Sequence, residues 1–510
     1  IDSPEMLGTK YRGGPLLELR SSALELIAMY MERYDDDMQP FAQQLMRTVW
    51  DIISAPGSAN PASDDLVVSA LGFFEASCRG PHRELLTQVM QPLCVDVVLP
   101  SLELTEDDVE AFEDDAAAYI QRDIEGSDVH TRRHSACKLV RELLAVFGDA
   151  CSAVLNECIG NLVARGTWQG RDAAIVLVTA MGLKASSSAA MADSHAMAAA
   201  GSELTNYVDL ASFYDQQISP ELSAPGDSEI GTAVLKADAL RFVATFRFHL
   251  PAASLAALLP HISQFLQHDN VVVQSYAAHT IQRILALPVA GAPSQLQLGD
   301  AEIGEYVPLL LERLCGRLGQ DRRLNEYTVK CLSQVLRAAP AASQPYNGDI
   351  TTVLATVLVE LTKNPSNPLF SHYFFECVGY TLRLAGDSAD QCMAIEALLW
   401  DPLLAILRDD VVELLPYALQ VLALLLDLHP AGSASRSPAA PTSAYPNTSA
   451  RTPEHFMGLY EPLCSDALFE AKGNVPAAIR LICAFLRKDP DQLNAAGHMP
   501  RTLGLAAKLL

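Results

Sequence analysis

Residues 255–287 read LAALLPHISQFL, QHDN and VVVQSYAAHTIQRILAL in succession. In the first and third of these stretches, apolar residues recur with the spacing of one helix face, and the polar middle stretch separates them. We therefore predict two antiparallel helices, over 255–266 and 271–287, joined by a corner at 267–270. In the second helix, the side chains predicted to face inward are those of Ala277, Ile281 and Ile284.

Three features of this stretch are typical of HEAT repeats. Pro260 lies inside the first helix and is expected to bend it, because proline removes a hydrogen bond of the helical ladder. Asp269 in the corner is predicted to cap the second helix. Small residues such as Ala277 let the two helices pack closely, so we interpret the pair as one HEAT repeat.

Similar pairs follow along the chain. They are predicted at 305–319 with 325–336, at 350–363 with 368–384 and at 396–408 with 411–428. At a period of roughly 40–47 residues, the chain has room for about eleven or twelve repeats. Half of the residues are apolar and only 19% are charged, which suits stacked helices and excludes disorder. The predicted fold is an all-α HEAT-repeat solenoid, a superhelix of antiparallel helix pairs that forms one continuous array over residues 1–510.

Three segments interrupt the helical pattern without separating parts of different composition. They are an acidic insertion at 100–128, an insertion rich in Ala and Ser at 185–202, and a linker rich in Pro, Ser and Ala at 431–452. We expect the linker to be flexible.

The charge and the cysteines limit the class of protein. The formal net charge of −25 argues against nucleic acid as the ligand, because phosphate binding needs Lys and Arg gathered on one face. An acidic surface attracts basic protein partners, and it also keeps a protein soluble; both explanations stay open. Eleven cysteines are scattered without a CxxC pair, which predicts reduced core thiols in a cytosolic or nuclear protein.

Motifs for chemistry are missing from the sequence. It has no glycine-rich phosphate loop, no nucleophile elbow and no HExxH zinc motif, and His261 and His268 lack carboxylates at metal-ligand spacing. We predict that the chain is not an enzyme and that it has no catalytic residue, cofactor or metal. The longest apolar run, 173–183, is too short to cross a bilayer, so no membrane insertion is expected.

The most informative charged stretch runs from Phe112 to Arg133. Acidic residues precede a helix predicted to start near Asp128, and basic residues lie in its first turns. One interpretation is a solvated loop whose acids stabilise the helix N-terminus, with Ser127 or Asp128 as the cap. Arg132 and Arg133 would then pair with those acids. The other interpretation is an insertion between repeats that contacts a partner or limits bending. The candidate partner-binding or hinge residues are Glu113, Asp114, Arg122, Asp123, Glu125, Asp128, Arg132 and Arg133.

Seven sequence blocks, in order along the chain, carry a family resemblance. They are Phe112 to Arg133, Trp168 to Ile175, Val234 to Asp238, Tyr276 to His279, Lys363 to Pro368, Pro416 to Val421, and Gly473 to Ala477. In these blocks the chain resembles the exportin-2 family, also called the cellular apoptosis susceptibility family, of the importin-beta superfamily. Gln121 and His134 depart from the family pattern, as do the segments 185–202 and 431–452.

The resemblance implies a nuclear export receptor of the karyopherin type. Such a receptor binds importin-alpha cooperatively with Ran-GTP, meets nuclear pore proteins on its way, and returns importin-alpha to the cytoplasm. Localisation in both nucleus and cytoplasm is therefore expected. In physical terms, two ligands that stabilise the same closed curvature raise each other's affinity. The GTPase chemistry belongs to Ran.

Two other functions stay open. An import receptor of the same superfamily would suit basic cargo, but Ran-GTP would displace that cargo, whereas it promotes cargo binding in an exporter. A static HEAT scaffold, such as a phosphatase regulatory subunit, would not respond to Ran. An α-solenoid enzyme would need a convergent site, which the motif search does not support. Because the chain starts at Ile1 and no Ran-contacting domain is recognised ahead of Leu16, we expect an internal to C-terminal piece of the receptor.

Overall fold

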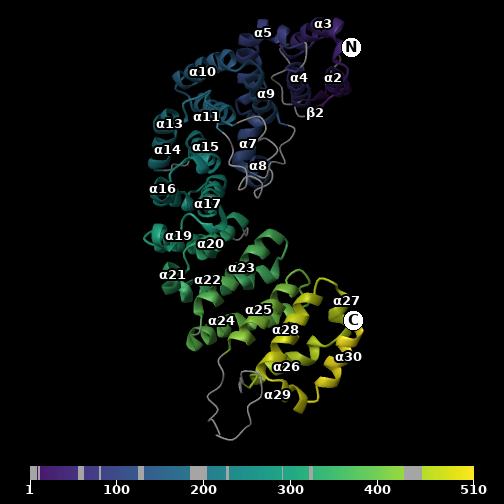
Figure 1. The fold of residues 1–510 in the computed structure, drawn as a ribbon, viewed down its shortest axis with the longest axis vertical. Helices are drawn as coiled ribbons and strands as arrows, with labels where there is room; N and C mark the ends of the chain where they lie inside the picture. Colours follow the sequence, from purple (N-terminus) through teal and green to yellow (C-terminus); the bar gives the residue numbers. More distant parts are fainter. Residues whose placement is uncertain are drawn as a thin grey trace. The chain divides into compact units, whose positions relative to one another are not determined.

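The computed structural model describes most of the chain, which divides into two compact units. The described residues are 8–9, 12–54, 63–79, 82–124, 131–183, 204–225, 229–289, 291–320, 325–386, 388–429 and 451–509. Unit 1 is Ile1–Gln295 and unit 2 is Leu296–Leu510. Both are built from helices (Figure 1). The prediction of an all-α fold is therefore confirmed, and the continuity of one array across both units stays a prediction.

Unit 1 begins with two short antiparallel strands, which pair Gly8 with Gly13 and Thr9 with Arg12. Its elements are β1 (Gly8–Thr9), β2 (Arg12–Gly13), α2 (Pro15–Arg33), α3 (Asp35–Ile53), α4 (Asp64–Ser77), α5 (Arg83–Pro92), the π-helix η3 (Leu93–Val98), α6 (Leu99–Leu102), α7 (Glu106–Asp114), α8 (Ala116–Ile124), α9 (Arg132–Phe147), α10 (Asp149–Ala164), α11 (Trp168–Gly182), α13 (Leu210–Phe213), the π-helix η6 (Tyr214–Ile218), α14 (Ser219–Ser223), α15 (Ile230–Phe246), η7 (Arg247–His249), α16 (Ala252–Gln264), η8 (Phe265–Gln267), α17 (Val271–Leu285) and β3 (Pro288–Val289).

The strand β4 (Ala292–Leu296), which pairs with β3, contains the boundary between the two units, and unit 2 is again built of helix pairs. Its helices are α18 (Asp300–Ile303), α19 (Val307–Gln320), α20 (Glu326–Ala338), α21 (Pro340–Ser343), η9 (Gln344–Tyr346), α22 (Asn347–Lys363), α23 (Pro368–Ala385), α24 (Ala389–Arg408), α25 (Leu415–Leu428), α26 (Glu454–Leu463), α27 (Asp466–Glu470), α28 (Val475–Lys488), α29 (Pro490–Ala495) and α30 (Met499–Leu509). The short strands were not foreseen from the sequence.

In each unit, every second long helix packs on the next one of its layer. In unit 1 the helices α2, α4, α9, α11, α15 and α17 contact one another in that order. In unit 2 the same is true of α20, α23, α25 and α28, while α19, α22 and α24 form the second layer (Figure 1). Each helix therefore buries its apolar faces against its neighbours in the repeat, as expected of a solenoid.

The pair α16 and α17 confirms the predicted repeat in all but its cap. Ala277, Ile281 and Ile284 are fully buried, and Pro260 lies inside α16. The cap is Asn270 rather than Asp269, because the Asn270 side chain accepts hydrogen bonds from the backbone N–H groups of Val272 and Val273. Side-chain caps also begin other long helices, namely α9 (Thr131) and α11 (Thr167) in unit 1 and α20 (Asn325) and α23 (Asn367) in unit 2.

The predicted start of the helix at Asp128 is wrong. Helix α9 begins at Arg132, and the Thr131 side chain accepts a hydrogen bond from the His134 backbone N–H. The acidic insertion 100–128 is helical over α7 and α8, so the interpretation of this segment as a loop, one of the two left open, is wrong there. Its residues 125–128, all of 185–202, and residues 431–450 of the linker lie outside the described residues.

The cysteines are placed as the sequence predicted. All eleven are free and eight are buried. Burial raises the pKa of the Cys78 thiol to about 12, which keeps it in the unreactive form. Within the described residues, one helical stretch, Arg83–Asp114, is long and apolar enough to cross a membrane by composition, and half of its most apolar window is buried inside the protein. Buried core helices pass the same test.

Candidate functional site: a charged helical insert on buried ion pairs

The acidic insertion folds as a short helix pair that caps itself. Thr105 and Asp108 form a capping box at the start of α7, in which each side chain accepts a hydrogen bond from the other residue's backbone N–H. Asp115 then accepts a hydrogen bond from the Ala118 N–H at the start of α8. The acids in the first turn of α7 lie where the helix dipole favours negative charge. Local capping therefore explains why so acidic a stretch is helical.

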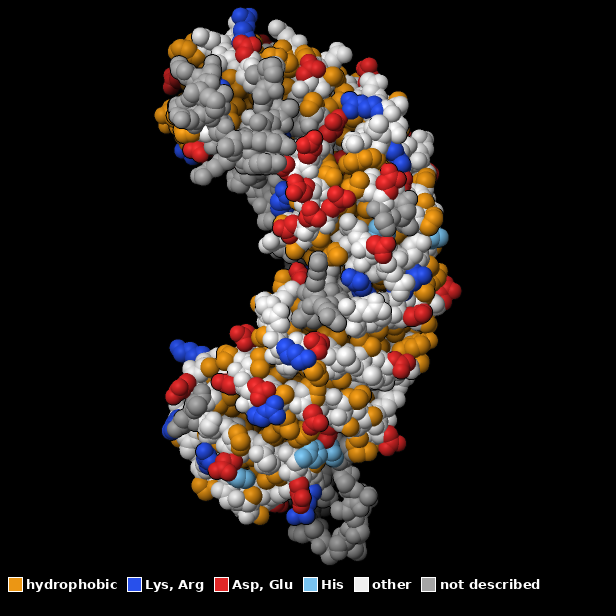
Figure 2. Space-filling model, turned by 180° about the vertical axis from the view of Figure 1, so that it is seen from behind, with side chains coloured by type: hydrophobic (Ala, Val, Ile, Leu, Met, Phe, Trp, Pro, Cys, Tyr) orange, Lys and Arg blue, Asp and Glu red, His pale blue; other side chains and the backbone are white. Residues whose placement is uncertain are grey.

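An aromatic contact joins α7 to α8. The rings of Phe112 and Tyr119 meet edge to face with centroids 5.0 Å apart, and Phe112 is fully buried. Glu113 and Asp114 sit beside Phe112 on the exposed face of α7. Of the candidate residues, these two acids are the ones whose described side chains lie exposed. Figure 2 shows that acidic side chains gather on one face of unit 1, where Lys and Arg are sparse.

Arg122 joins the two short helices. Its guanidinium lies 3.4 Å from an Asp108 carboxylate oxygen and 5.8 Å from the centre of the Tyr119 ring. Both charged side chains keep contact with water, so the pair is worth about 0–1 kcal/mol. Asp123 lies in the last turn of α8, with its side chain outside the described residues, as are Glu125 and Asp128.

Arg132 and Arg133 line a small pocket together with Asp108 of the acidic segment, and they form ion pairs with the neighbouring helices. Arg132 forms an ion pair with Asp64 of α4, and Arg133 forms one with Asp172 of α11 at 2.5 Å. Burial raises the pKa of the Asp64 carboxyl, and Arg132 partly offsets that effect. The two arginines therefore tie the start of α9 to the helices on either side of it. Neither of these two ion pairs involves an acid of residues 100–128, with which one of the two interpretations had paired the arginines.

Arg133 belongs to a buried charge cluster that spans three successive helices. Asp172 of α11 is fully buried, Asp238 of α15 is 6% exposed, and the Arg133 side chain is 16% exposed. Asp172 Oδ1 and Asp238 Oδ2 are buried without a hydrogen-bond partner among the described residues. One guanidinium therefore lies among two buried carboxyl groups. We call Arg133, Asp172 and Asp238 the α9–α15 charge cluster.

Two groups of this cluster, Asp238 and Arg133, have shifted pKa values. Burial raises the Asp238 pKa well above its ordinary value, and the neighbouring Asp172 carboxylate raises it further, against the opposing effect of Arg133. For Arg133, burial disfavours the charged form, but the neighbouring acidic groups, above all the Asp172 carboxylate, raise its pKa overall. The arrangement therefore favours a charged Arg133 paired with Asp172 and a protonated Asp238.

A second buried cluster lies where α11 and α15 meet α14. The Lys236 ammonium, which is fully buried, lies 3.1 Å from Glu221 Oε2, and Arg171 binds Glu221 Oε1 at 2.8 Å. Lys236 also donates to the Glu221 backbone carbonyl. Close packing accompanies these contacts: a Cβ on Gly231 would lie 2.5 Å from Trp168 Cδ1. A glycine is required there because α15 touches the indole ring.

These clusters explain two of the sequence blocks that carry the resemblance. The blocks at 168–175 and 234–238 supply Arg171, Asp172, Lys236 and Asp238, whose contacts are internal. Sequence reasoning did not select these four residues as a site. A signal was present, because Lys236 and Asp238, with Arg241, are the charged residues of a helix that is mostly apolar. Among the described residues, no group of three or more His, Cys, Asp or Glu is arranged to hold a metal ion.

Comparisons with known proteins agree along the whole chain. The sequence profile of the Cse1 family matches residues 4–281, and that of the CAS/CSE protein C-terminus matches residues 282–440 and 443–510. Exportin-2 of Oreochromis niloticus is 31% identical over 509 residues, which cover 97% of this chain and 49% of that protein. The chain thus spans about half the length of the curated relatives it matches.

Solved structures show the same fold. The exportin Cse1 in its cargo-free, cytoplasmic state matches with a TM-score of 0.75 and 26% sequence identity, covering 98% of this chain and 50% of that one. Yeast importin-beta (Kap95p) matches with a TM-score of 0.54 and 14% identity, over 96% of this chain and 52% of that one. Fold and helix pairing therefore define the chain as a helical-repeat solenoid of the importin-beta superfamily. Within that class it belongs to the Cse1 family, the family of CAS/CSE proteins.

Proposed function

We propose that the chain is part of a nuclear export receptor that binds importin-alpha together with Ran-GTP and returns importin-alpha to the cytoplasm. The observation that carries this proposal is the match to exportin-2 over nearly the whole chain. The structure of an exportin is also similar over 98% of the chain. Shuttling through the nuclear pore, with contacts to pore proteins, follows from the same proposal.

The geometry of unit 1 supports a division of labour within the charged segment. Glu113 and Asp114 are exposed and suit contact with a basic surface of a protein partner. Arg132 and Arg133 hold α9 to α4 and α11, so they act on the rigidity of the repeats rather than by touching a partner. Arg122, Asp123, Glu125 and Asp128 lie between these two groups in sequence and belong to the proposed hinge.

The test is a pull-down of importin-alpha on the full-length form of this protein, with Ran-GTP, with Ran-GDP and without Ran. We expect retention only with Ran-GTP. Release of importin-alpha by Ran-GTP would instead identify an import receptor, and retention that ignores Ran would identify a static scaffold. Either result would overturn the proposal.

A paired variant tests the exposed acids. Replacing Glu113 with Gln and Asp114 with Asn removes two favourable charge contacts. Retention of the partner that these acids contact, importin-alpha or Ran-GTP, should then fall about tenfold. The matched control replaces Asp36 and Asp37, exposed acids of α3 in the same unit, with Asn. Equal retention by the two double variants would exclude Glu113 and Asp114 as contact residues.

A further inference from the structure

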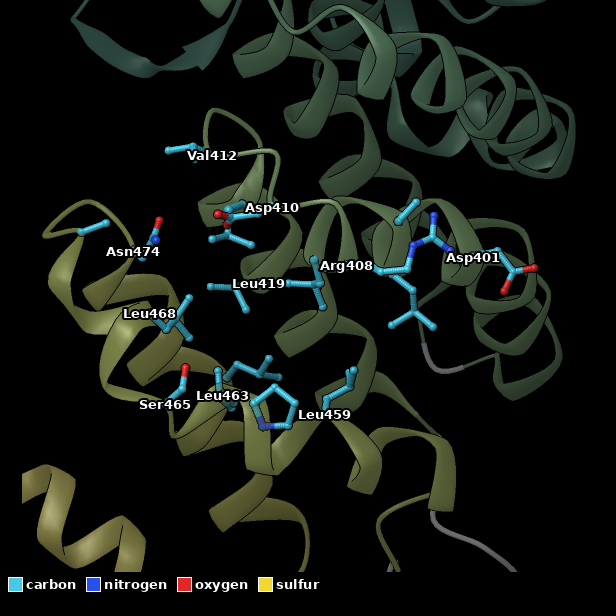
Figure 3. Close-up of a pocket in the computed structure, with 17 residues that line it drawn as sticks. Asp401, Arg408, Asp410, Val412, Leu419, Leu459, Leu463, Ser465, Leu468 and Asn474 are labelled. Carbon is cyan, nitrogen blue, oxygen red and sulfur yellow. The ribbon is translucent and has the colours of Figure 1, made fainter.

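A groove in unit 2 lies between the α24–α25 pair and the helices α26 to α28. Its volume is about 820 Å³. Figure 3 shows leucines from both sides converging on its floor, with Leu419 from one side and Leu459, Leu463 and Leu468 from the other. A cavity of this size, with apolar walls and a few polar groups, is typical of a site that accepts bulky apolar side chains.

The rim of the groove is acidic. Asp401 and Asp410 line it, and no described residue forms an ion pair with either. The basic residue of the rim, Arg408, is held by Asp409 through two hydrogen bonds of 2.8 and 3.0 Å. Because Asp409 balances Arg408, the charges of Asp401 and Asp410 remain in excess. Val412, which is 57% exposed, adds an apolar edge to the same rim.

Asp410 holds an unfavourable backbone conformation at this rim. Its φ is +50°, and it is the one residue other than glycine with a positive φ in the described part of the chain. It follows the end of α24, where the Val411 N–H bonds to the Ile406 carbonyl and closes the helix. Glycine is the favoured residue at this position of a helix end. A carboxylate thus stands beside an apolar groove at a position where the backbone prefers glycine, and such strain concentrates at binding sites.

We propose that this groove binds a short segment of a partner protein, in which a bulky apolar side chain is adjacent to Lys or Arg. The apolar side chain enters between Leu419 and Leu459, and the basic group lies beside Asp401 or Asp410. The chain carries a formal charge of −25, so a second copy of it would be repelled by the same rim, as would an anionic lipid surface. This inference does not depend on Ran or importin-alpha.

The probes are three fluorescein-labelled peptides of equal length that share the same leucines and differ in the neighbouring residues, which are Lys, Gln or Glu. Binding to the whole chain is measured by fluorescence anisotropy. We expect the Lys peptide to bind about tenfold more tightly than the Glu peptide, and its affinity to fall as salt is raised. Equal binding of all three, or no binding of any, would overturn the proposal.

Asp410→Gly separates a binding role from a structural one. The glycine relieves the positive φ, so the melting temperature should stay the same or rise, while the affinity for the Lys peptide falls about threefold to tenfold. Asp401→Asn should lower the affinity similarly, and the control Asp491→Asn, an exposed acid of α29 in the same unit, should not. An affinity unchanged by both groove variants would refute the assignment.

Leu459→Gln tests the apolar floor. Leu459 is partly exposed in the groove, so the variant is expected to fold and to bind all three peptides more weakly. A second copy of the chain is the competing ligand for the groove. Sedimentation of the unliganded chain measures whether it self-associates. Self-association that disappears in Leu459→Gln would identify a second copy of the chain as the ligand and overturn the proposal.

Discussion

The two units share helix-pair packing, but their helix interfaces are filled with different chemistry. In unit 1 the interface of α9, α11 and α15 contains the α9–α15 charge cluster. In unit 2 the interface of α23 and α25 is apolar and aromatic, and the rings of Phe375 and Tyr417 stack in parallel with centroids 4.9 Å apart. Arg and Lys ion pairs of unit 2, such as Arg487 with Asp427, lie at the surface.

The difference shows that the same helix-pair architecture can be stabilised by apolar contacts or by buried ion pairs. Apolar interfaces gain stability in proportion to the area removed from water. Buried charges stabilise only while every partner is present, because an unpaired charge in the interior is costly. We therefore expect unit 1 to be sensitive to loss of its buried Arg and Lys charges, and unit 2 to tolerate loss of its exposed arginines. The buried carboxylate of unit 2, Glu396, is held instead by His455 at 2.7 Å.

Removal of Arg133 should have the largest effect. Arg133→Met leaves the fully buried Asp172 carboxylate without its ion-pair partner, so we expect a loss of about 3–5 kcal/mol. The measurement is urea unfolding followed by tryptophan fluorescence, because Trp50 and Trp168 report on unit 1 and Trp400 on unit 2.

The matched control for Arg133 is in the other unit. Arg487→Met removes a pair whose arginine side chain is 58% exposed, and it should cost at most about 1 kcal/mol. If the two substitutions lowered stability equally, the contrast between the units would be wrong.

Replacement of Lys236 should have an intermediate effect. Lys236→Met removes a buried cation, but Glu221 keeps Arg171 at 2.8 Å, so we expect a loss of about 1–3 kcal/mol. Adding Glu221→Gln should then cost less than it does in the wild-type background. Strictly additive losses in this double-mutant cycle would show that Lys236 and Glu221 do not interact.

The sequence predicted the helix pairs better than it predicted the partners of the charged residues. Ala277, Ile281 and Ile284 were assigned to the core correctly because helical periodicity is a local property. Arg133 and Asp172, in contrast, are 39 residues apart, and their pairing depends on how successive repeats stack. The segment from Phe112 to Arg133 was therefore recognised as charged, but its inward and outward residues could not be separated.

Small errors in the predicted positions of helix caps have a similar origin. The cap of α17 was placed on Asp269, one residue before the actual cap, Asn270. Both residue types cap helices well, so composition cannot choose between neighbours, and only the local backbone geometry decides. For α9, the sequence offered Ser127 and Asp128, and the structure uses Thr131.

The α9–α15 charge cluster should make the stability of unit 1 depend on pH. This effect should be smaller than those of the substitutions above, but it reports on the protonation of Asp238. The folded-state pKa of Asp238 is raised by burial and by Asp172, so folding favours its protonated form. The resulting stability is fully present below the unfolded-state pKa and is lost as the pH rises through the folded-state pKa. Asp238→Asn removes this loss, so its melting temperature should exceed that of the wild type at pH 8 more than at pH 4.

Melting curves of the two proteins between pH 4 and pH 8 provide the measurement, with Trp50 and Trp168 as reporters of unit 1. Asp427→Asn, which changes an exposed carboxylate of unit 2, serves as the control and should leave the pH profile of unit 1 unchanged. Parallel profiles for Asp238→Asn and the wild type would mean that Asp238 is ionised in both states.

Arg122→Gln should have the smallest effect. It tests whether burial of the charges is the cause of the difference between the two units. Arg122 lies in unit 1, but its pair with Asp108 is exposed, with 38% of the arginine side chain accessible. If burial causes the sensitivity of unit 1, this substitution costs at most about 1 kcal/mol, as for Arg487→Met in unit 2. A loss as large as that of Arg133→Met would show instead that the acidic insert, rather than burial, makes unit 1 sensitive. Urea unfolding of the three variants side by side separates these two explanations.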